Sequence, residues 1–305
     1  MEKLKIIIPI ENHPTNVQHL VVLLNNIKEV VKRDHEVIIV NHNDSKLPEG
    51  FLKSISSEYL ININLTNDKF YYKNESYFML KPEIFKYIID RFEPPYFFID
   101  PDNIILKDIP PLGTGEVLIY ETPLEGYSGE VTKLLLEMFQ MGGLDIPFKH
   151  FNTHCIYTDS KEFVKDWYKT SKDIALFGKH HINKTLGNRY QHFCEELAVT
   201  LLCDKYDIKN KYFDGYLDKF EKPGPECVVY HYDFYDNLKK LNDKYSRIYR
   251  YFGNIPKHKA TKDAMIEDFD LVRNEIKRFI FCAEEPKSQP AKNILRWNEE
   301  YNFNE

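Results

Sequence analysis

The sequence predicts one α/β domain, in which helices flank a mixed and mostly parallel central sheet. Short apolar runs rich in β-branched and aromatic residues alternate with longer segments whose apolar residues recur every three or four positions. The first units follow one another as strand, helix and strand, which is typical of a parallel sheet covered by helices. The chain has 305 residues, of which 43% are hydrophobic, so it can bury a sizeable core.

The first strands of this sheet are predicted near the N-terminus. Residues 3–10 form an apolar run and are expected to be a buried strand. Residues 14–32 repeat apolar side chains on one helical face, and Pro14 suits the start of that helix. A second buried strand is expected at residues 35–40 (HEVIIV), and a third, alternating strand at residues 59–65.

The middle of the chain continues the pattern. Residues 74–90 have helical spacing, and Pro82 is expected to start a new segment or to kink the helix. The run YFFI at residues 96–99 predicts a further buried strand. Two more strands are expected at residues 104–106 and 116–120.

The second half of the chain is predicted to begin near Phe148 and to contain more helix. Ile156 marks one candidate strand, and the run CVVY at residues 227–230 marks a late one. Because no flexible linker separates the halves, we expect them to share one core. Helices are expected from apolar spacing at residues 130–141, 161–172, 193–206 and 261–281.

Charge and cysteine content exclude several classes of protein. Lys plus Arg number 41 and Asp plus Glu number 47, giving a net charge of −6, whereas a protein that binds nucleic acid should be basic. The five cysteines form no CxxC pair, which favours free thiols in a reducing compartment over disulfides or a zinc site. The sequence contains no GxGxxG or GxxxxGK[ST] phosphate loop.

The sequence contains no recognisable membrane-targeting segment. No apolar run approaches the roughly 18 residues that a transmembrane helix needs. The N-terminal apolar stretch is short, and Pro9 and Glu11 interrupt it, unlike the apolar region of a signal peptide. We therefore expect a cytoplasmic protein, located in the host cytoplasm if its source is a virus.

The clearest candidate site follows the strand at residues 96–99. Asp100 and Asp102 end this apolar run, separated by Pro101, which is expected to turn the chain. Buried carboxylates need cations, hydrogen bonds or solvent. A hard divalent ion such as Mn²⁺ or Mg²⁺, carrying phosphate oxygens, would neutralise both acids. The alternative is a pair of turn residues that merely cap the strand.

Residues 99–108 (IDPDNIILKD) resemble the DxD segment of GT-A-fold glycosyltransferases. In that family an apolar strand delivers the motif and a second β-type stretch follows it, and the order of elements is similar over most of the chain. The resemblance implies a GT-A fold and a hexosyl- or pentosyltransferase that depends on a divalent metal. It would move sugar from a UDP- or GDP-sugar donor to a glycan or another hydroxyl acceptor.

Other short segments carry the same resemblance. The first strand ends in PIE, with Pro9 and Glu11, as at the family's nucleotide-binding start, and Asp44 follows the second strand where the family often contacts base or ribose. Residues 151–153 (FNT) resemble the acceptor-side segment fN(S/T)G, although His154 replaces the usual Gly. The resemblance implies that the nucleotide sugar contacts six residues: Pro9, Glu11, Asp44, Lys73, Asp100 and Asn152.

The resemblance also implies a set of metal ligands. Asp102 would bind Mn²⁺ or Mg²⁺ directly, and Asp100 would face the ribose or reach the ion through water. His231, in the late segment VYHY, would complete the coordination, and a packed strand-end histidine is the alternative. Lys73 lies just before the helix on which the family often has a basic residue for the diphosphate or sugar, and a solvated surface lysine is the alternative.

Glu195 and Glu196 are the candidate catalytic acids. They stand in CEEL, which resembles the acidic motif that opens a late helix in inverting members of the family. An inverting transfer needs a base near the acceptor hydroxyl, whereas a retaining one does not. The alternative for either glutamate is a favourable interaction with the positive end of the helix dipole.

Under this resemblance, residues 1–112 form the nucleotide-sugar-binding half of the domain. Residues 113–260 form the acceptor-binding half of the same domain, and residues 261–305 form a C-terminal helix and tail.

Two other functions stay open at this level. Haloacid-dehalogenase-like phosphatases also place DxD after an apolar strand, with the first Asp as nucleophile, but their motif normally opens the domain. They also need a later acidic pair, GDxxxD or DD, which does not follow residue 102. A non-catalytic module that binds a nucleotide or glycan is the second alternative.

Overall fold

Most of the described chain belongs to one α/β arrangement around a six-stranded sheet. Its strand order is β3-β2-β1-β4-β7-β6; β1 to β4 are mutually parallel, whereas β7 is antiparallel to both β4 and β6. The strands are β1 (Leu4–Ile10), β2 (His35–His42), β3 (Tyr59–Ile63), β4 (Tyr96–Ile99), β6 (Val117–Thr122) and β7 (His150–Thr158). The computed structural model describes residues 2–10, 20, 23, 24, 26–42, 59–63, 80–122, 134, 150–180, 183, 184, 187, 190, 193–215 and 226–231.

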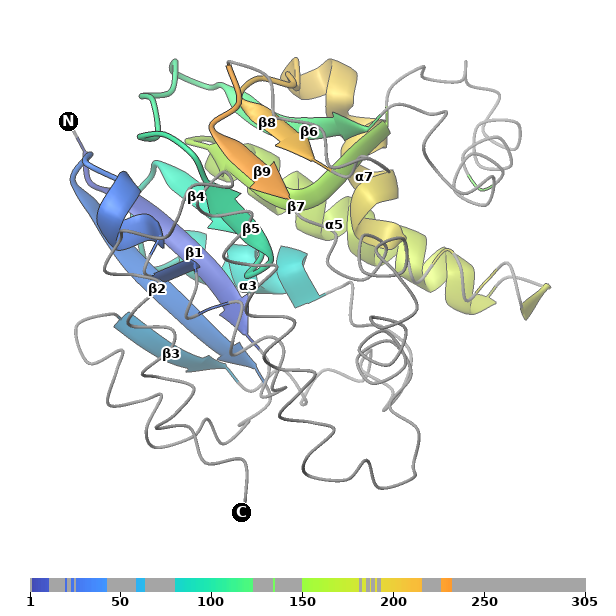
Figure 1. Ribbon diagram of the computed structural model, residues 1–305. Helices are drawn as coiled ribbons and strands as arrows, with labels where there is room; N and C mark the ends of the chain where they lie inside the picture. The colour runs from blue at the N-terminus through green and yellow to red at the C-terminus, as the bar shows by residue number, and fades with distance from the viewer. Residues whose placement is uncertain are drawn as a thin grey trace, which may run out of the picture.

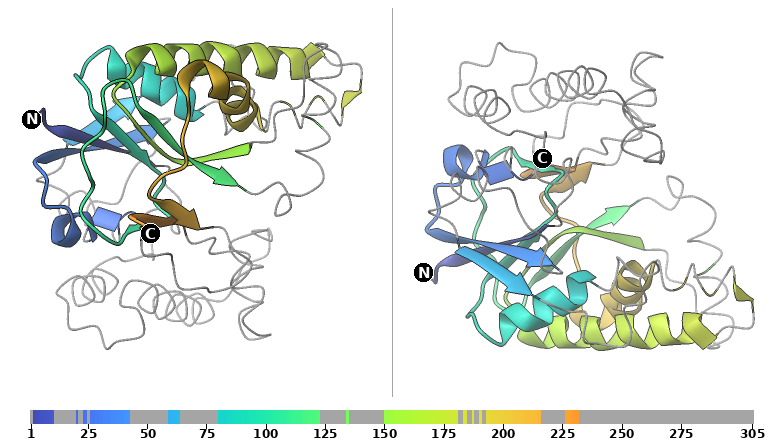
Figure 2. Two further views of the ribbon diagram at one scale, coloured as in Figure 1. Left: turned by 90° about the horizontal axis from the view of Figure 1, so that it is seen from above. Right: turned by 90° about the horizontal axis from the view of Figure 1, so that it is seen from below.

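Different elements cover the two faces of this sheet (Figures 1 and 2). Three helices pack on one face: α3 (Leu80–Ile89), α5 (Lys161–His180) and α7 (Cys194–Tyr206). A three-stranded sheet of order β5-β9-β8 packs on the other face, together with the helical residues 26–30. Its strands are β5 (Asn103–Ile105), β8 (Phe213–Gly215) and β9 (Val229–His231). The fold is therefore the mixed, mostly parallel α/β class that the sequence predicts.

Burial on both faces explains why the central strands are continuous apolar runs. In β4, Phe97 and Ile99 enter the core beneath the small sheet, whereas Tyr96 and Phe98 enter the core beneath the helices. All four side chains are fully buried. This alternation decides on which side of the sheet the residues after β4 emerge.

Asn26 links the small sheet to the helical residues 26–30. Its amide Nδ2 donates to the carbonyl of Ile105 at 2.9 Å, and its Oδ1 accepts the Ile105 N–H at 2.7 Å. The buried side chain thus replaces a missing strand partner for β5. Because β5 directly follows the two acids of the DxD motif, this anchor holds the end of the motif in place.

Two predicted elements need correction, and one strand was not predicted. β7 is a full strand, of which only Ile156 was expected, because its first half is polar. α5 continues to His180 rather than to residue 172, since Ile174 and Ala175 extend its buried face. β8 was not expected, because its sequence FDG has no apolar run. Elsewhere the described strand ends agree with prediction to within two residues.

Some predictions lie outside the described residues or are described only in part. The helix at residues 14–32 is described from residue 20, with gaps, and α3 begins at Leu80 with Pro82 in its first turn. Several other predicted features lie outside the described residues: Glu11, Asp44, Lys73, the helix at residues 261–281 and most of residues 130–141. The proposed division at residue 112 stays a prediction, although β4 and β7 join both sides in one sheet. None of the helices in the described part of the chain is long and apolar enough to cross a bilayer.

Candidate active site

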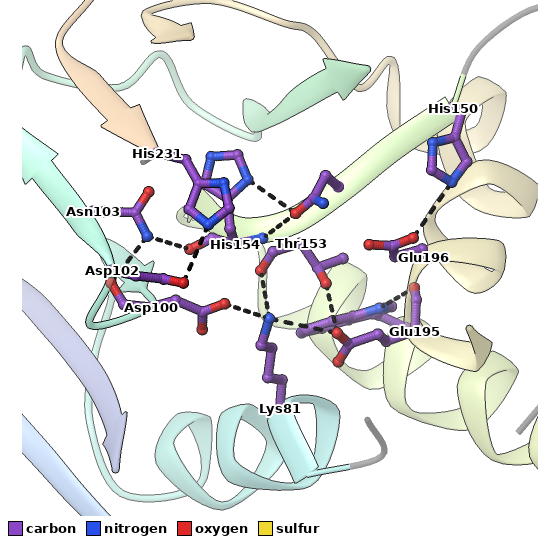
Figure 3. Close-up of polar contacts among 12 residues, drawn as sticks. Lys81, Asp100, Asp102, Asn103, His150, Thr153, His154, Glu195, Glu196 and His231 are labelled. Carbon is purple, nitrogen blue, oxygen red and sulfur yellow. Dashed lines mark hydrogen bonds and ion pairs between the residues drawn. The ribbon is translucent and has the colours of Figure 1, made fainter. Parts of the chain in front are cut away.

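Asp100 lies at the carboxyl end of β4, on the side of the sheet that α3 covers (Figure 3). The alternation along β4 places it there, since Ile99 enters the opposite core. Its Oδ2 is 2.6 Å from Nζ of Lys81, which stands in the first turn of α3. A lysine at a helix N-terminus is opposed by the helix dipole, so the carboxylate compensates for an unfavourable position.

Asp102 meets a different partner. Pro101 and Asp102 form a turn, and the side chain of Asn103 secures it by donating to the carbonyl of Asp100 at 2.9 Å. Asp102 therefore faces β9 of the small sheet, where its Oδ2 lies 3.3 Å from Nε2 of the buried His231. The two acids of the motif do not share one face, because the turn between them separates their directions.

Glu195 completes a buried polar cluster around Lys81. The hydroxyl of Thr153, on β7, donates to Glu195 Oε1 at 2.8 Å, and Lys81 Nζ lies 3.4 Å from the same oxygen. The indole N–H of Trp167 donates to the backbone carbonyl of Glu195 at 2.9 Å, which fixes the start of α7 against α5. The side chain of Glu195 is only 2% exposed. One ammonium group thus faces two carboxylates, Asp100 and Glu195.

Burial and charge oppose each other in this cluster. Burial alone would lower the pKa of Lys81, but Asp100 and Glu195 outweigh it and raise that pKa above its usual value. Burial raises the pKa of Asp100 to about 6 and that of Glu195 to about 7, although Lys81 opposes both shifts. Lys81 therefore stays charged at neutral pH, while the two acids gain protons as the pH falls below neutral.

The Glu195→Gln variant is expected to change how stability depends on pH. The folded state holds the Glu195 proton more tightly than the unfolded state, so wild-type stability is favoured at low pH and is lost as the pH rises toward 7. The variant lacks this titration. Urea unfolding should show wild type losing about 2 kcal/mol relative to Glu195→Gln between pH 5 and pH 8. A constant difference would mean that the proton affinity of Glu195 does not change on folding.

Glu196 has a separate environment. Its Oε2 lies 3.5 Å from Nε2 of His150, the first residue of β7, and its side chain is less buried than that of Glu195. The two neighbouring glutamates thus point to different partners, Glu195 to the Lys81 cluster and Glu196 to an imidazole (Figure 3). Of these two glutamates, Glu196 combines partial exposure with a neighbouring imidazole.

His154 stands beside the acid–histidine pair of Asp102 and His231. Its ring stacks on the ring of His231, with centroids 4.4 Å apart and planes inclined by 14°. Its backbone N–H donates to Oδ1 of Asn152 at 2.9 Å, and its ring Nδ1 lies 2.9 Å from the same oxygen. Burial lowers the pKa of His154 well below its usual value, so the ring is neutral at physiological pH.

The residues present fit a divalent cation bound together with a phosphate ligand. The carboxylate of Asp102 and the imidazole of His231 are an oxygen and a nitrogen donor 3.3 Å apart. Asp100 is already neutralised by Lys81, so it suits a contact through water better than a direct bond. Across the described ranges, no group of three or more His, Cys, Asp and Glu side chains forms a complete cage. Such an ion would therefore take its remaining ligands from water and phosphate.

The structure brings together five of the residues proposed from the sequence. Asp100, Asp102, Glu195 and His231 belong to the contacts above, and Asn152 binds His154 next to them. Glu196 lies one residue away, paired with His150. Pro9 is buried near the carboxyl end of β1, the strand next to β4. Lys81 was not predicted, and Lys73, which was proposed for a similar role, lies outside the described residues.

No protein-family model matches the sequence, and no curated protein matches it. Among solved structures, the galactosyltransferase LgtC, in complex with donor and acceptor sugar analogues, has a TM-score of 0.52 at 11% identity over 83% of this chain and 98% of LgtC. Mouse xyloside xylosyltransferase 1 has a TM-score of 0.49 at 10% identity, over 76% of this chain and 98% of its own. GlyE of Streptococcus pneumoniae has 0.45 at 11% identity, over 98% of this chain and 64% of its own.

The likeness to LgtC concerns the fold. At 11% identity it says nothing by itself about substrate or chemistry, but it spans almost all of LgtC. Together with the six-stranded sheet order, it shows that this chain has a GT-A-type fold. The predicted fold class is thus confirmed by both topology and comparison.

Proposed function

We propose that the protein is a metal-dependent glycosyltransferase that moves a hexose or pentose from a nucleotide-diphosphate sugar to a hydroxyl group of a glycan or another acceptor. The observation that carries this proposal is the pairing of Asp102 with His231 at the carboxyl edge of a GT-A-type sheet. Ligands of α/β sheets bind at this edge. LgtC, which has the same fold, is a galactosyltransferase.

In this proposal Asp102 and His231 hold Mn²⁺ or Mg²⁺, and Asp100 contacts it through water or faces the ribose. When bound, the ion supplies positive charge to the diphosphate that leaves as the glycosidic bond breaks. The imidazole donor favours Mn²⁺ over Mg²⁺, which prefers all-oxygen ligand sets.

In this proposal Lys81 takes the role that was predicted for Lys73. Its ammonium group stays charged and lies between Asp100 and Glu195. We assign it to stabilise negative charge on the phosphate or sugar oxygens as the donor bond breaks. Glu195 holds Lys81 in place from the other side.

Glu196 is the better of the two candidate bases. Its neighbour Glu195 is buried and engaged by Thr153 and Lys81, so a proton from an acceptor hydroxyl cannot easily reach it. Glu196 pairs with His150 and remains partly exposed. If the transfer inverts the anomeric centre, Glu196 accepts the proton of the acceptor hydroxyl. The imidazole of His150 then holds the Glu196 carboxylate in position.

Calorimetric titration of the protein with UDP and with GDP tests the proposed function. Binding of one nucleotide is expected to be at least about tenfold tighter with Mn²⁺ than with EDTA, because a cation held by Asp102 and His231 would attract the negative charge of the diphosphate. A parallel screen of nucleotide sugars should reveal slow, metal-stimulated hydrolysis of the donor.

Two results would contradict this function. Nucleotide affinity that is independent of metal would remove the bridging ion. Release of inorganic phosphate from phosphate monoesters, without release of a nucleoside diphosphate, would favour the phosphatase alternative instead.

A further inference from the structure

His154 is a buried histidine that the proposed chemistry does not use. It is 2% exposed, and its ring lies between elements that come from distant parts of the chain. It stacks on His231 of β9 and also packs against Tyr120 of β6, with ring centroids 5.2 Å apart. A glycine, which is the usual residue at this place in the resembling segment, has no side chain to make either contact.

Hydrogen bonding fixes which nitrogen of His154 carries the proton. Oδ1 of Asn152 accepts the backbone N–H of His154, so this atom is an oxygen and not the amide nitrogen. An oxygen can bind the neighbouring Nδ1 only if Nδ1 carries a hydrogen. The other nitrogen, Nε2, is then a bare acceptor, and it has no hydrogen-bond partner among the described residues.

The stacked geometry argues against a shared ion between the two histidines. An imidazole lone pair lies in the plane of its ring, so His231 and His154 would each offer a lone pair only within its own ring plane. The plane of His154 is nearly parallel to that of His231 and displaced, with an inclination of only 14°. The same ion therefore cannot lie in line with Nε2 of His154 unless one ring rotates out of the stack.

We propose that His154 is a positioning residue, whose stacked ring holds His231 facing Asp102 before the cation binds. The backbone supports the same role, because the carbonyl of His154 accepts the Asp100 N–H at 2.8 Å. One residue of β7 thus orients both the acidic turn and the histidine. This inference rests on the proposed function, since it concerns the same Asp102–His231 cation site.

Titration of the apo protein with Mn²⁺, followed by the electron paramagnetic resonance signal of the free ion, tests the inference without activity. His154→Ala and His154→Leu both remove the stacking ring, and Leu does so without leaving a cavity. Each is expected to weaken Mn²⁺ binding by about tenfold or more, as loss of an orienting contact typically does. His154→Phe keeps a flat ring and should stay within about threefold of wild type.

A matched control is His35→Ala, which removes an imidazole at the amino end of β2, away from the site. Its Mn²⁺ affinity should equal that of wild type. Wild-type affinity in folded His154→Ala or His154→Leu would overturn the inference alone. Binding by His154→Phe as weak as by His154→Ala would also overturn it, because the nitrogen and not the ring would then matter. A wild-type protein that binds no Mn²⁺ would overturn the cation site and this inference together.

Discussion

Asp102→Asn is expected to lower the turnover of the nucleotide-sugar donor by at least about 100-fold, because in the proposed function this carboxylate would hold the divalent cation. The amide is nearly the same size as the carboxylate, and Asp102 lies in a turn at the edge of the sheet. The fold should therefore survive. Steady-state release of nucleoside diphosphate measures the effect, and thermal unfolding checks the fold.

Asp90→Asn is the matched control for this variant. It makes the same chemical change on an exposed acid. Asp90 directly follows the last residue of α3 and precedes the amino end of β4, whereas Asp102 follows the carboxyl end. The turnover of Asp90→Asn should match wild type. A folded Asp102→Asn variant with normal turnover would show that the ion, if one is needed, binds elsewhere. A wild-type protein that binds metal and nucleotide but turns over no donor would support a non-catalytic binding module.

The sequence predicts the central sheet well because its strands are buried on both faces. Side chains of β4 enter two separate cores in alternation, so every position must be apolar, and the run YFFI is visible without any homologue. The same reasoning fails for β7. Its residues His150, Asn152 and Thr153 are polar and contact other residues of the candidate site, so the first half of the strand lacks an apolar pattern.

Residues of the candidate site can be predicted only where they belong to a local sequence motif. Asp100 and Asp102 end an apolar strand, which is an unusual place for two acids, and His231 ends another. Lys81 has no such local sign, since Asp100 and Glu195 meet it only in the folded chain. One indirect signal existed: a lysine beside Pro82 stands in the first turn of a helix, where its charge is unfavourable without an acidic partner.

His154 shows a different limit of sequence reasoning. This histidine stands where the resembling family segment usually has glycine. The role of its side chain depends on which other ring it contacts in the folded chain. The stack with His231 joins β7 to β9, two strands that belong to different sheets and do not pair. No periodicity or spacing encodes a contact of this kind, because it depends on how the two sheets pack.

Lys81→Met is expected to reduce both stability and turnover. The variant leaves Asp100 and Glu195 buried without their shared cation, and breaking such a cluster from one side should cost about 3 kcal/mol at pH 8. Turnover should fall by about 100-fold, since in the proposed function Lys81 would stabilise negative charge on the departing phosphate or sugar oxygens. Urea unfolding and donor turnover measure the two effects.

The loss of stability should depend on pH in a defined direction. Both acids already have raised pKa values, about 6 and about 7, and the loss of Lys81 raises them further. A folded state with raised acid pKa values binds more protons than the unfolded state, so its stability falls as the pH rises through that range. The defect of Lys81→Met should therefore be large at pH 8 and smaller at pH 5, where the acids take up protons.

Two comparisons separate the buried cluster from a general loss of charge. Lys86→Met changes an exposed lysine of the same helix, which lies 3.9 Å from Asp90, and should alter stability by less than about 0.5 kcal/mol. Adding Glu195→Gln to Lys81→Met removes one of the two buried carboxylates that have lost their cation, and it should restore part of the lost stability. If the double variant is instead less stable than Lys81→Met, then Glu195 stabilises the fold through Thr153 and not through its charge on Lys81.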